Sequence, residues 1–196
     1  MTNDTPFEQI YNEFRTPVLR YLQRLIGAGE AEDAAQEVFV KVHRGLRDFR
    51  KNSRLSTWVY RIATNAAVDR MRSPSFRQEQ PLGMDNEETD VFYDKKTPPP
   101  DVQLIRKEMS ECIRGYVDAL PPHSRTILVL SELEGFKNGE IAEILGVSLD
   151  TVKIRLHRAR ARLKKTLEAH CSFYRDERNE FACDRKEPIL KFHKKK

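Results

Sequence analysis

The chain has 196 residues, of which 35 are Lys or Arg and 30 are Asp or Glu, for a formal net charge of +5. No stretch approaches the roughly 18 apolar residues of a membrane-spanning helix, and no charged-then-apolar leader opens the chain, which predicts a cytoplasmic protein. Three cysteines are too few for a disulfide framework. The length leaves one medium domain or two small ones.

The charges are unevenly distributed along the chain. Basic and acidic residues number 13 and 9 in residues 1–78, 2 and 7 in residues 79–101, 5 and 8 in residues 102–150, and 15 and 6 in residues 151–196. Both ends are therefore basic and the middle is acidic. A local positive excess can bind phosphate groups even when the total charge is small, although a merely solvated basic tail is the alternative.

Apolar residues recur every three or four positions in residues 7–25, which predicts an amphipathic helix. Pro17 is the residue at which this helix could bend, and Gly27 and Gly29 are expected to end it. A second apolar stripe, from Ala31 to Leu46, predicts a second helix.

A third helix is expected to start near Ser53 or Ser56, either of which could act as its N-cap, and to run to about Met71. Ser73-Pro74 would end it, because the residue before a proline disfavours helical geometry.

Residues 79–101 show no periodicity and end in three prolines, which predicts an acidic, flexible linker. Beyond it the sequence predicts a helix up to Leu120, a short helix from Ser124 to Glu134 closed by a left-handed Gly135, and a short helix ending at Leu145. We therefore expect an all-α fold with two small helical domains. The expected segments are 1–78, 79–101 as the linker, 102–169, and a basic tail at 170–196.

The turn at Gly146 has the features of a helix-turn-helix. Ile141, Ala142 and Leu145 form a short apolar face, Gly146 suits positive φ, and Ser148 can cap the next helix. That helix places its apolar residues on one face. The rest carries seven cations and, within residues 151–167, no acid: Lys153, Arg155, Arg158, Arg160, Arg162, Lys164 and Lys165. DNA phosphate is the obvious partner for such a helix.

The first block carries two further patterns. In residues 30–43, Asp33, Gln36 and Glu37 lie on the outer face of the predicted helix, where Glu37 can pair with Lys41. The only tryptophan, Trp58, follows among arginines with Tyr60 near it. Cations for the backbone and rings for unstacked bases are what single-stranded nucleic acid requires.

These patterns together resemble the extracytoplasmic-function (group IV) sigma factors of bacterial RNA polymerase. Glu32-Asp33…Gln36-Glu37-Val38-Phe39 looks like regions 2.1–2.2, and Leu55-Ser56-Thr57-Trp58-Val59-Tyr60-Arg61…Asn65…Asp69 looks like regions 2.3–2.4. Leu120-Pro121…Glu134-Gly135…Glu140-Ile141-Ala142…Gly146-Val147…Thr151-Val152-Lys153 looks like region 4. The resemblance covers about residues 7–168.

The resemblance implies an initiation factor without catalytic residues, metal or cofactor, whose site residues fall into three sets. Core polymerase would be bound by Asp33, Gln36, Glu37 and Phe39. The −10 element would be read and melted by Arg50, Asn52, Ser53, Arg54, Trp58, Arg61, Asn65 and Arg72. The −35 element would be bound by Thr151, Lys153, Ile154, Arg155, His157, Arg158, Arg160 and Arg162.

The resemblance also implies partners. These are the clamp helices of the largest polymerase subunit, the flap of the second-largest subunit, promoter DNA in duplex and single-stranded form, and an anti-sigma factor. The free protein would be a monomer.

Two departures from the family pattern concern region 4. Lys137-Asn138-Gly139 replaces the usual capping sequence, so that helix is expected to start at Asn138. Ile154 replaces a small polar residue, and an aliphatic side chain suits a thymine methyl group.

The tail contains Cys171 and Cys183 with His170 and His193. The cysteine spacing matches no common zinc pattern, so no special role is favoured, while a reversible Cys171–Cys183 disulfide and a metal site stay open.

Two other functions remain to be weighed. A polymerase-independent helix-turn-helix regulator would use residues 1–78 for oligomerisation or sensing, but such a domain does not require the array around Trp58. An enzyme is disfavoured because the sequence has no Gly-rich phosphate loop and no nucleophile–base arrangement.

Overall fold

The structure is a computed structural model, and it describes residues 7–49, 53–73, 109–110, 112–177 and 179–186. The chain divides into two compact units. One joins residues 1–91 with residues 120–159, and the other joins residues 92–119 with residues 160–196. The expected linker at 79–101 and the expected site residues Arg50 and Asn52 lie outside the described residues.

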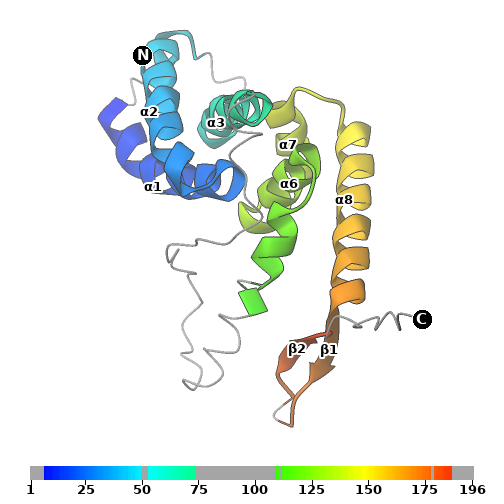
Figure 1. Ribbon diagram of the computed structural model, residues 1–196. Helices are drawn as coiled ribbons and strands as arrows, with labels where there is room; N and C mark the ends of the chain where they lie inside the picture. The colour runs from blue at the N-terminus through cyan, green and yellow to red at the C-terminus, as the bar shows by residue number, and fades with distance from the viewer. Residues whose placement is uncertain (1–6, 50–52, 74–108, 111, 178, 187–196) are drawn as a thin grey trace, which may run out of the picture. The chain divides into compact units, whose positions relative to one another are not determined.

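The N-terminal part of the first unit is a bundle of three helices in which each helix contacts the other two. Figure 1 shows them in blue to cyan as α1 (Phe7–Ile26), α2 (Ala28–Gly45) and α3 (Leu55–Arg72), with the single-turn η1 (Leu46–Asp48) after α2. The predicted apolar stripes form the core, because Ile10, Val18, Leu22, Val38, Val42, Val59 and Ala63 are buried. Helix α1 continues through Pro17.

Two predicted boundaries of the bundle are wrong. Gly27 alone separates α1 from α2, because its φ of 81° changes the direction of the backbone. Gly29 already belongs to the first turn of α2. The N-cap of α3 is Arg54 rather than Ser53 or Ser56, and no side chain caps this end. The backbone of Arg54 is extended, which makes Leu55 the first helical residue and leaves Ser53 one position too early to cap.

Further along the chain, residues 109–110 and 112–118 are helical. Helix α6 (Pro122–Leu128) continues as the π-helical η2 (Val129–Leu133). The sequence predicted that this helix starts at Ser124, but α6 starts two residues earlier, at Pro122. The fixed φ of a proline suits the first position of a helix. Gly135 has φ 73°, as expected for the residue that closes it.

The helix-turn-helix is formed by α7 (Asn138–Leu145) and α8 (Leu149–His170). Helix α7 starts at Asn138 as predicted, and the Lys137 amide donates to Glu140 Oε2 at 2.9 Å. Its buried residues are Ile141 and Ile144, whereas the predicted Ala142 and Leu145 are only half-buried. Ile141 and Ile144 are three residues apart and share the inward side of the helix.

The helical prediction is confirmed for both domains, but it missed two strands in the tail. Strand β1 (Cys171–Arg175) pairs antiparallel with β2 (Phe181–Arg185), with Cys171 opposite Arg185 and Phe173 opposite Cys183. Asn179 adopts φ 62° in the loop, a left-handed geometry that asparagine tolerates. Two five-residue strands are too short for a clear alternation signal. Within the described helices, none combines the length and the apolar character that crossing a membrane requires.

Candidate functional site

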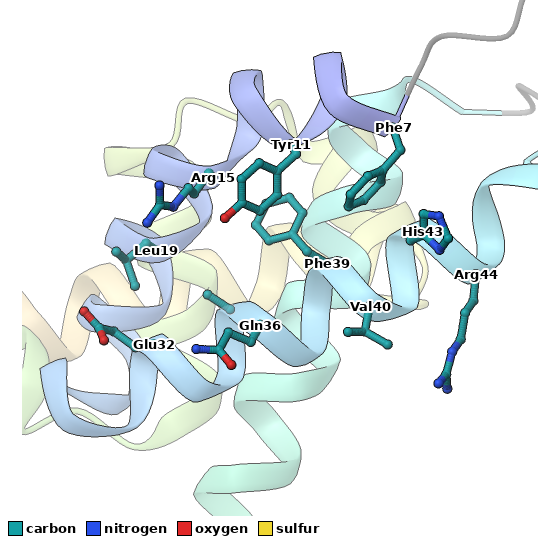
Figure 2. Close-up of a pocket in the computed structure, with 11 residues that line it drawn as sticks. Phe7, Tyr11, Arg15, Leu19, Glu32, Gln36, Phe39, Val40, His43 and Arg44 are labelled. Atoms are coloured by element: carbon teal, nitrogen blue, oxygen red, sulfur yellow. The ribbon is translucent and has the colours of Figure 1, made fainter.

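A groove of about 600 Å³ lies between α1 and α2. Figure 2 shows Arg15 and Leu19 on the α1 side, and Glu32, Gln36 and Val40 along α2. Val40 is 48% exposed, which is unusual for a valine on a packed helix. The groove is partly apolar and open to solvent.

Two aromatic pairs form the floor of this groove (Figure 2). The Tyr11 and Phe39 rings meet edge to face with centroids 4.9 Å apart, and Phe7 meets His43 in the same way at 4.9 Å. The guanidinium carbon of Arg15 lies over the Tyr11 ring, 5.7 Å from its centroid. Edge-to-face pairs hold each ring in one orientation, so the groove is preformed.

The residues predicted to bind polymerase lie at this groove and beside it. Asp33, Gln36 and Glu37 are exposed on α2, and Gln36 lines the groove. Phe39 is only 5% exposed, so it shapes the groove floor and does not project from the surface. Glu37 accepts from Arg70 Nη2 of α3 at 2.7 Å, an ion pair with α3 that the i,i+4 rule could not predict.

Apart from Ser53, which precedes the helix, the described residues predicted to read the −10 element share one face of α3. Arg54, Trp58, Arg61, Asn65 and Arg72 fall within an arc of roughly 60° at 100° per residue. Arg54, Arg61, Asn65 and Arg72 are exposed, and Ser53 and Trp58 are half-buried. The helix thus places cations and an indole together.

The indole of Trp58 is held by its neighbours. Its ring centroid lies 4.9 Å from that of Phe49 at a tilt of 35°. A Cβ atom added to Gly45 would lie 3.1 Å from Trp58 Cζ2, closer than ordinary van der Waals contact. Gly45 therefore provides the space for the indole, and sequence reasoning missed this role because nothing in the helical pattern marks it.

Tyr60 does not belong to that face, although the sequence placed it near Trp58. It is 5% exposed, and its ring packs on Tyr21 at 5.0 Å and on Phe136 at 4.7 Å. Its hydroxyl donates to Glu134 Oε2 at 2.7 Å. Burial, and then the Glu134 carboxylate, raise the pKa of Tyr60 above its ordinary value.

The turn between α7 and α8 has the expected chemistry. Gly146 has φ 63° and ψ 38°, and the Val147 amide donates to the Ala142 carbonyl at 3.1 Å. Ser148 Oγ accepts from the Thr151 amide at 3.2 Å and contacts the Thr151 hydroxyl at 2.8 Å. Ser148 is thus the N-cap of α8, as predicted.

Helix α8 exposes nearly all of the residues predicted to bind the −35 element: Lys153, Ile154, Arg155, His157, Arg158, Arg160 and Arg162. Ile154 is 52% exposed, which leaves an aliphatic surface among cations. Thr151 differs, since it is half-buried and engaged by the cap. Val152, Leu156 and Ala159 form the buried side, as the predicted stripe requires.

The cysteines of the tail lie on one face of the hairpin but in diagonal positions. Diagonal partners on adjacent strands have Cβ atoms farther apart than a disulfide allows, so this register disfavours a Cys171–Cys183 bond. Burial, followed by the nearby Cys171 and Cys112 thiols, raises the pKa of Cys183, which lowers its reactivity. His193 lies outside the described residues. Within the described ranges, no group of three or more metal-ligating side chains is arranged around a common centre.

A polar cluster that the sequence did not predict links the two blocks. Glu134 accepts from Arg24 Nη1 at 2.6 Å and from the Tyr60 hydroxyl at 2.7 Å. The sequence signal was present, since Tyr60 and Glu134 both stand within the motifs quoted above. Their proximity required the tertiary structure, because they are 74 residues apart.

Comparison with known families agrees with this geometry. The family described as "Sigma-70 region 2" matches residues 10–76, a range that includes α2, α3 and most of α1, and "Sigma-70, region 4" matches residues 110–163, which include the helix-turn-helix. The region 2 match leaves no basis for a separate sensor domain there. The architecture is that of a two-domain transcription initiation factor.

Two curated relatives define the group more narrowly. The ECF RNA polymerase sigma factor SigW of Bacillus subtilis is 32% identical over 165 residues, covering 82% of this chain and 88% of the relative. RNA polymerase sigma factor YlaC of Bacillus subtilis is 34% identical over 168 residues, with coverage of 85% and 95%. The chain belongs to the extracytoplasmic-function sigma factors of the sigma-70 family, which direct promoter-specific initiation of transcription.

A solved structure supports the fold. The sigma factor RpoE of Bartonella quintana, determined in complex with the anti-sigma factor NepR, has a TM-score of 0.61 and 21% identity. The match covers 83% of this chain and 96% of that protein.

Proposed function

We propose that three surfaces divide the work of promoter-specific initiation. The groove between α1 and α2, with Asp33, Gln36 and Glu37 beside it, binds the clamp helices of the largest polymerase subunit. The outer face of α3 reads the −10 element, and the outer face of α8 reads the −35 element. We also propose that region 4 contacts the flap of the second-largest subunit.

The observation that carries this proposal is the setting of Trp58. A single indole braced by Phe49 and surrounded by Arg54 and Arg61 combines a stacking surface with cations. An unstacked base needs this combination, because the ring holds the base while the cations hold the phosphates.

The region 4 part of the proposal rests on α8. Base contacts come from the first turns of a recognition helix, here Lys153, Ile154, His157 and Arg158. Arg155, Arg160 and Arg162 are exposed for phosphate contacts. Thr151 contacts Ser148 through its hydroxyl group, so its main role is to fix the start of α8.

The wider setting follows from the same proposal. We place the domains at 1–78 and 102–169, with an acidic linker at 79–101 between them and a separate tail at 170–196. The protein acts in the cytoplasm as a monomeric initiation factor and catalyses no reaction itself. The anti-sigma factor in the Bartonella quintana complex suggests a comparable partner for this chain.

The direct test is run-off transcription on genomic DNA with purified core polymerase, with and without Trp58→Ala. We expect specific starts from the native protein. Loss of one stacked base costs about 1–3 kcal/mol, so the variant should open promoters about 5- to 150-fold less well, measured by permanganate reactivity. Duplex −35 binding should be unchanged.

The matched control is Tyr174→Ala, which removes an exposed aromatic side chain from strand β1. It should open promoters like the native protein. If Trp58→Ala abolishes duplex binding, or if the native protein binds duplex sites but supports no specific starts, the assignment fails.

A further inference from the structure

Ile154 is an aliphatic residue that α8 exposes among charged and polar side chains. Its exposed fraction is 52%, and the exposed residues nearest to it on the helix are Lys153, Arg155, His157 and Arg158. An exposed aliphatic side chain forgoes the free energy that burial would provide, but single ones are common on protein surfaces. The direction in which Ile154 points therefore decides whether it has a partner.

That direction is set by the buried side of α8. The residues that form this side are Val152, Leu156 and Ala159. At 100° per residue, Ile154 lies roughly 170° around the helix from their centre, so its side chain points directly away from the core. The start of α8 is fixed by Ser148, whose Oγ accepts from the Thr151 amide at 3.2 Å. Ile154 therefore stands in the second turn of a helix with a defined beginning.

Charged and polar side chains lie on both sides of Ile154. Its neighbours in the chain, Lys153 and Arg155, lie about 100° around the helix to either side. One turn further on, His157 and Arg158 lie about 60° and 40° to either side. All four are exposed. The outer surface of this part of α8 therefore has an aliphatic centre between two flanks that carry hydrogen-bond donors.

A helix that enters the major groove of DNA meets two kinds of surface. Its flanks face the phosphates along the walls, and its outermost line faces the base edges on the floor. An aliphatic side chain neither donates nor accepts a hydrogen bond, so covering guanine O6 or the cytosine amino group with Ile154 would leave a polar group without a partner. The C5 methyl group of thymine is the apolar group that the major groove presents.

We propose that Ile154 is a specificity-determining residue of α8, which selects a thymine in the −35 element by packing against the C5 methyl group of that base. This inference rests on the proposed reading of the −35 element by α8, and it names the chemical group that the centre of that surface recognises. The contact contributes to sequence preference, whereas Arg155, assigned above to a phosphate, contributes equally to every sequence.

The test begins with the full chain, alone and with purified core polymerase, and a pool of duplex DNA that has a randomised central segment. Selection of the bound duplexes gives the preferred sequence. Each thymine in it is then replaced in turn by deoxyuridine, which forms the same base pair and lacks only the C5 methyl group. At the thymine that Ile154 contacts, we expect the replacement to raise the Kd about fourfold, because the burial of one methyl group is lost.

Ile154→Ser identifies that thymine. Serine has almost the same helix propensity as isoleucine but offers no aliphatic surface, so α8 should keep its stability and lose the contact. The variant should bind the thymine and deoxyuridine duplexes with equal affinity at that one position. The slope of log affinity against log salt should stay at the native value, because no phosphate contact is removed.

Two variants serve as controls. Leu133→Ser removes an aliphatic side chain of similar exposure, 54%, from η2, and it should keep the effect of deoxyuridine at every position. Arg155→Ala should weaken binding to the thymine and deoxyuridine duplexes by the same factor. Melting temperatures identify any variant that fails to fold.

The outcomes separate the contact from the proposed function. An effect of deoxyuridine at one position that is lost in Ile154→Ser and kept in Leu133→Ser supports the contact. Sequence-specific binding in which deoxyuridine has no effect, or has the same effect in the native protein and in Ile154→Ser, overturns the contact alone. Binding without any sequence preference, with and without polymerase, overturns the reading of the −35 element by α8 as well.

Discussion

At the scale of single residues, the buried hydroxyl groups of the first bundle are arranged as a relay. Tyr21 contacts Thr64 Oγ1 at 2.7 Å, and Thr64 donates its proton to the Tyr60 carbonyl at 2.6 Å. Since the Thr64 proton is used there, Tyr21 must be the donor to Thr64. Each hydroxyl proton then has one acceptor, which allows two polar groups to be buried at little cost.

This arrangement predicts sensitivity to alkali. Burial raises the pKa of Tyr21 above its ordinary value of about 10. Between that value and the higher folded pKa, the unfolded chain loses its proton while the folded chain keeps it. Stability is therefore full below about pH 10 and falls above it, by about 1.4 kcal/mol per pH unit for each such tyrosine.

The measurement is urea unfolding from pH 8 to 11 for the native protein and Tyr21→Phe. The variant should lose about 0.5–1.5 kcal/mol at pH 8, from the missing hydrogen bond, and should show a shallower decline above pH 10. An equal decline of the free energy of unfolding in the two proteins would show that Tyr21 does not cause the loss of stability above pH 10.

At the scale of elements, the turn between α7 and α8 depends on one backbone conformation. Gly146 has φ 63°, and a Cβ atom added there would meet nothing within 4 Å. The cost of Gly146→Ala is therefore conformational and not steric, about 1–2 kcal/mol. We expect that loss in urea unfolding, together with weaker duplex binding, because the turn sets the direction of α8.

Gly139→Ala is the matched control, since position 139 also has open space but no positive φ and lies within α7. It should be neutral or stabilising by up to about 1 kcal/mol. If both alanine variants behave alike, the left-handed geometry at Gly146 does not contribute to stability.

The tail shows how an element changes the interpretation of its residues. The sequence favoured no special role for Cys171 and Cys183, and it left open a disulfide between them or a metal site. The strand register places them diagonally. Outside the hairpin, the Tyr116 hydroxyl lies 4.0 Å from Cys171 Sγ. Cys171 is 3% exposed, so it acts as a buried packing residue in this unit.

At the scale of the whole molecule, the uneven charge predicts where salt acts. Residues 151–196 carry 15 basic and 6 acidic residues, and the predicted DNA-facing cations of α8 are exposed. Each phosphate contact released by mutation should reduce the slope of log affinity against log salt by about 0.9. Arg155→Ala should therefore lower the duplex-binding slope by about one unit.

Arg15→Ala provides the comparison for that slope. Arg15 is equally cationic and exposed, but it lies on α1 at the groove proposed to bind polymerase. Its removal should leave the salt dependence of duplex binding unchanged. The same reduction in both variants would show that the salt dependence reflects total charge and not the face of α8.

Much of the fold could be predicted because a helix requires a pattern of apolar residues within a short stretch of sequence. The three- and four-residue spacing that placed Val38, Val59 and Leu156 inside is the spacing by which a helix turns one side inward. Gly135 and Gly146 were equally readable, since a left-handed residue at a helix end has a local backbone cause. Helix starts were less predictable. Helix α3 begins after Arg54, whose side chain does not cap the helix, so the sequence holds no capping residue that indicates this start.

By itself, the sequence determined the helical class, the two motif-bearing blocks and the basic face of α8, each of which depends on residues a few positions apart. Only the tertiary structure decided which side chains from distant segments meet. Tyr60 turned out to contact Glu134 and Phe136, Gly45 was found to make room for Trp58, and Glu37 was found to pair with Arg70. Such contacts depend on how helices pack, and no local pattern encodes the partner.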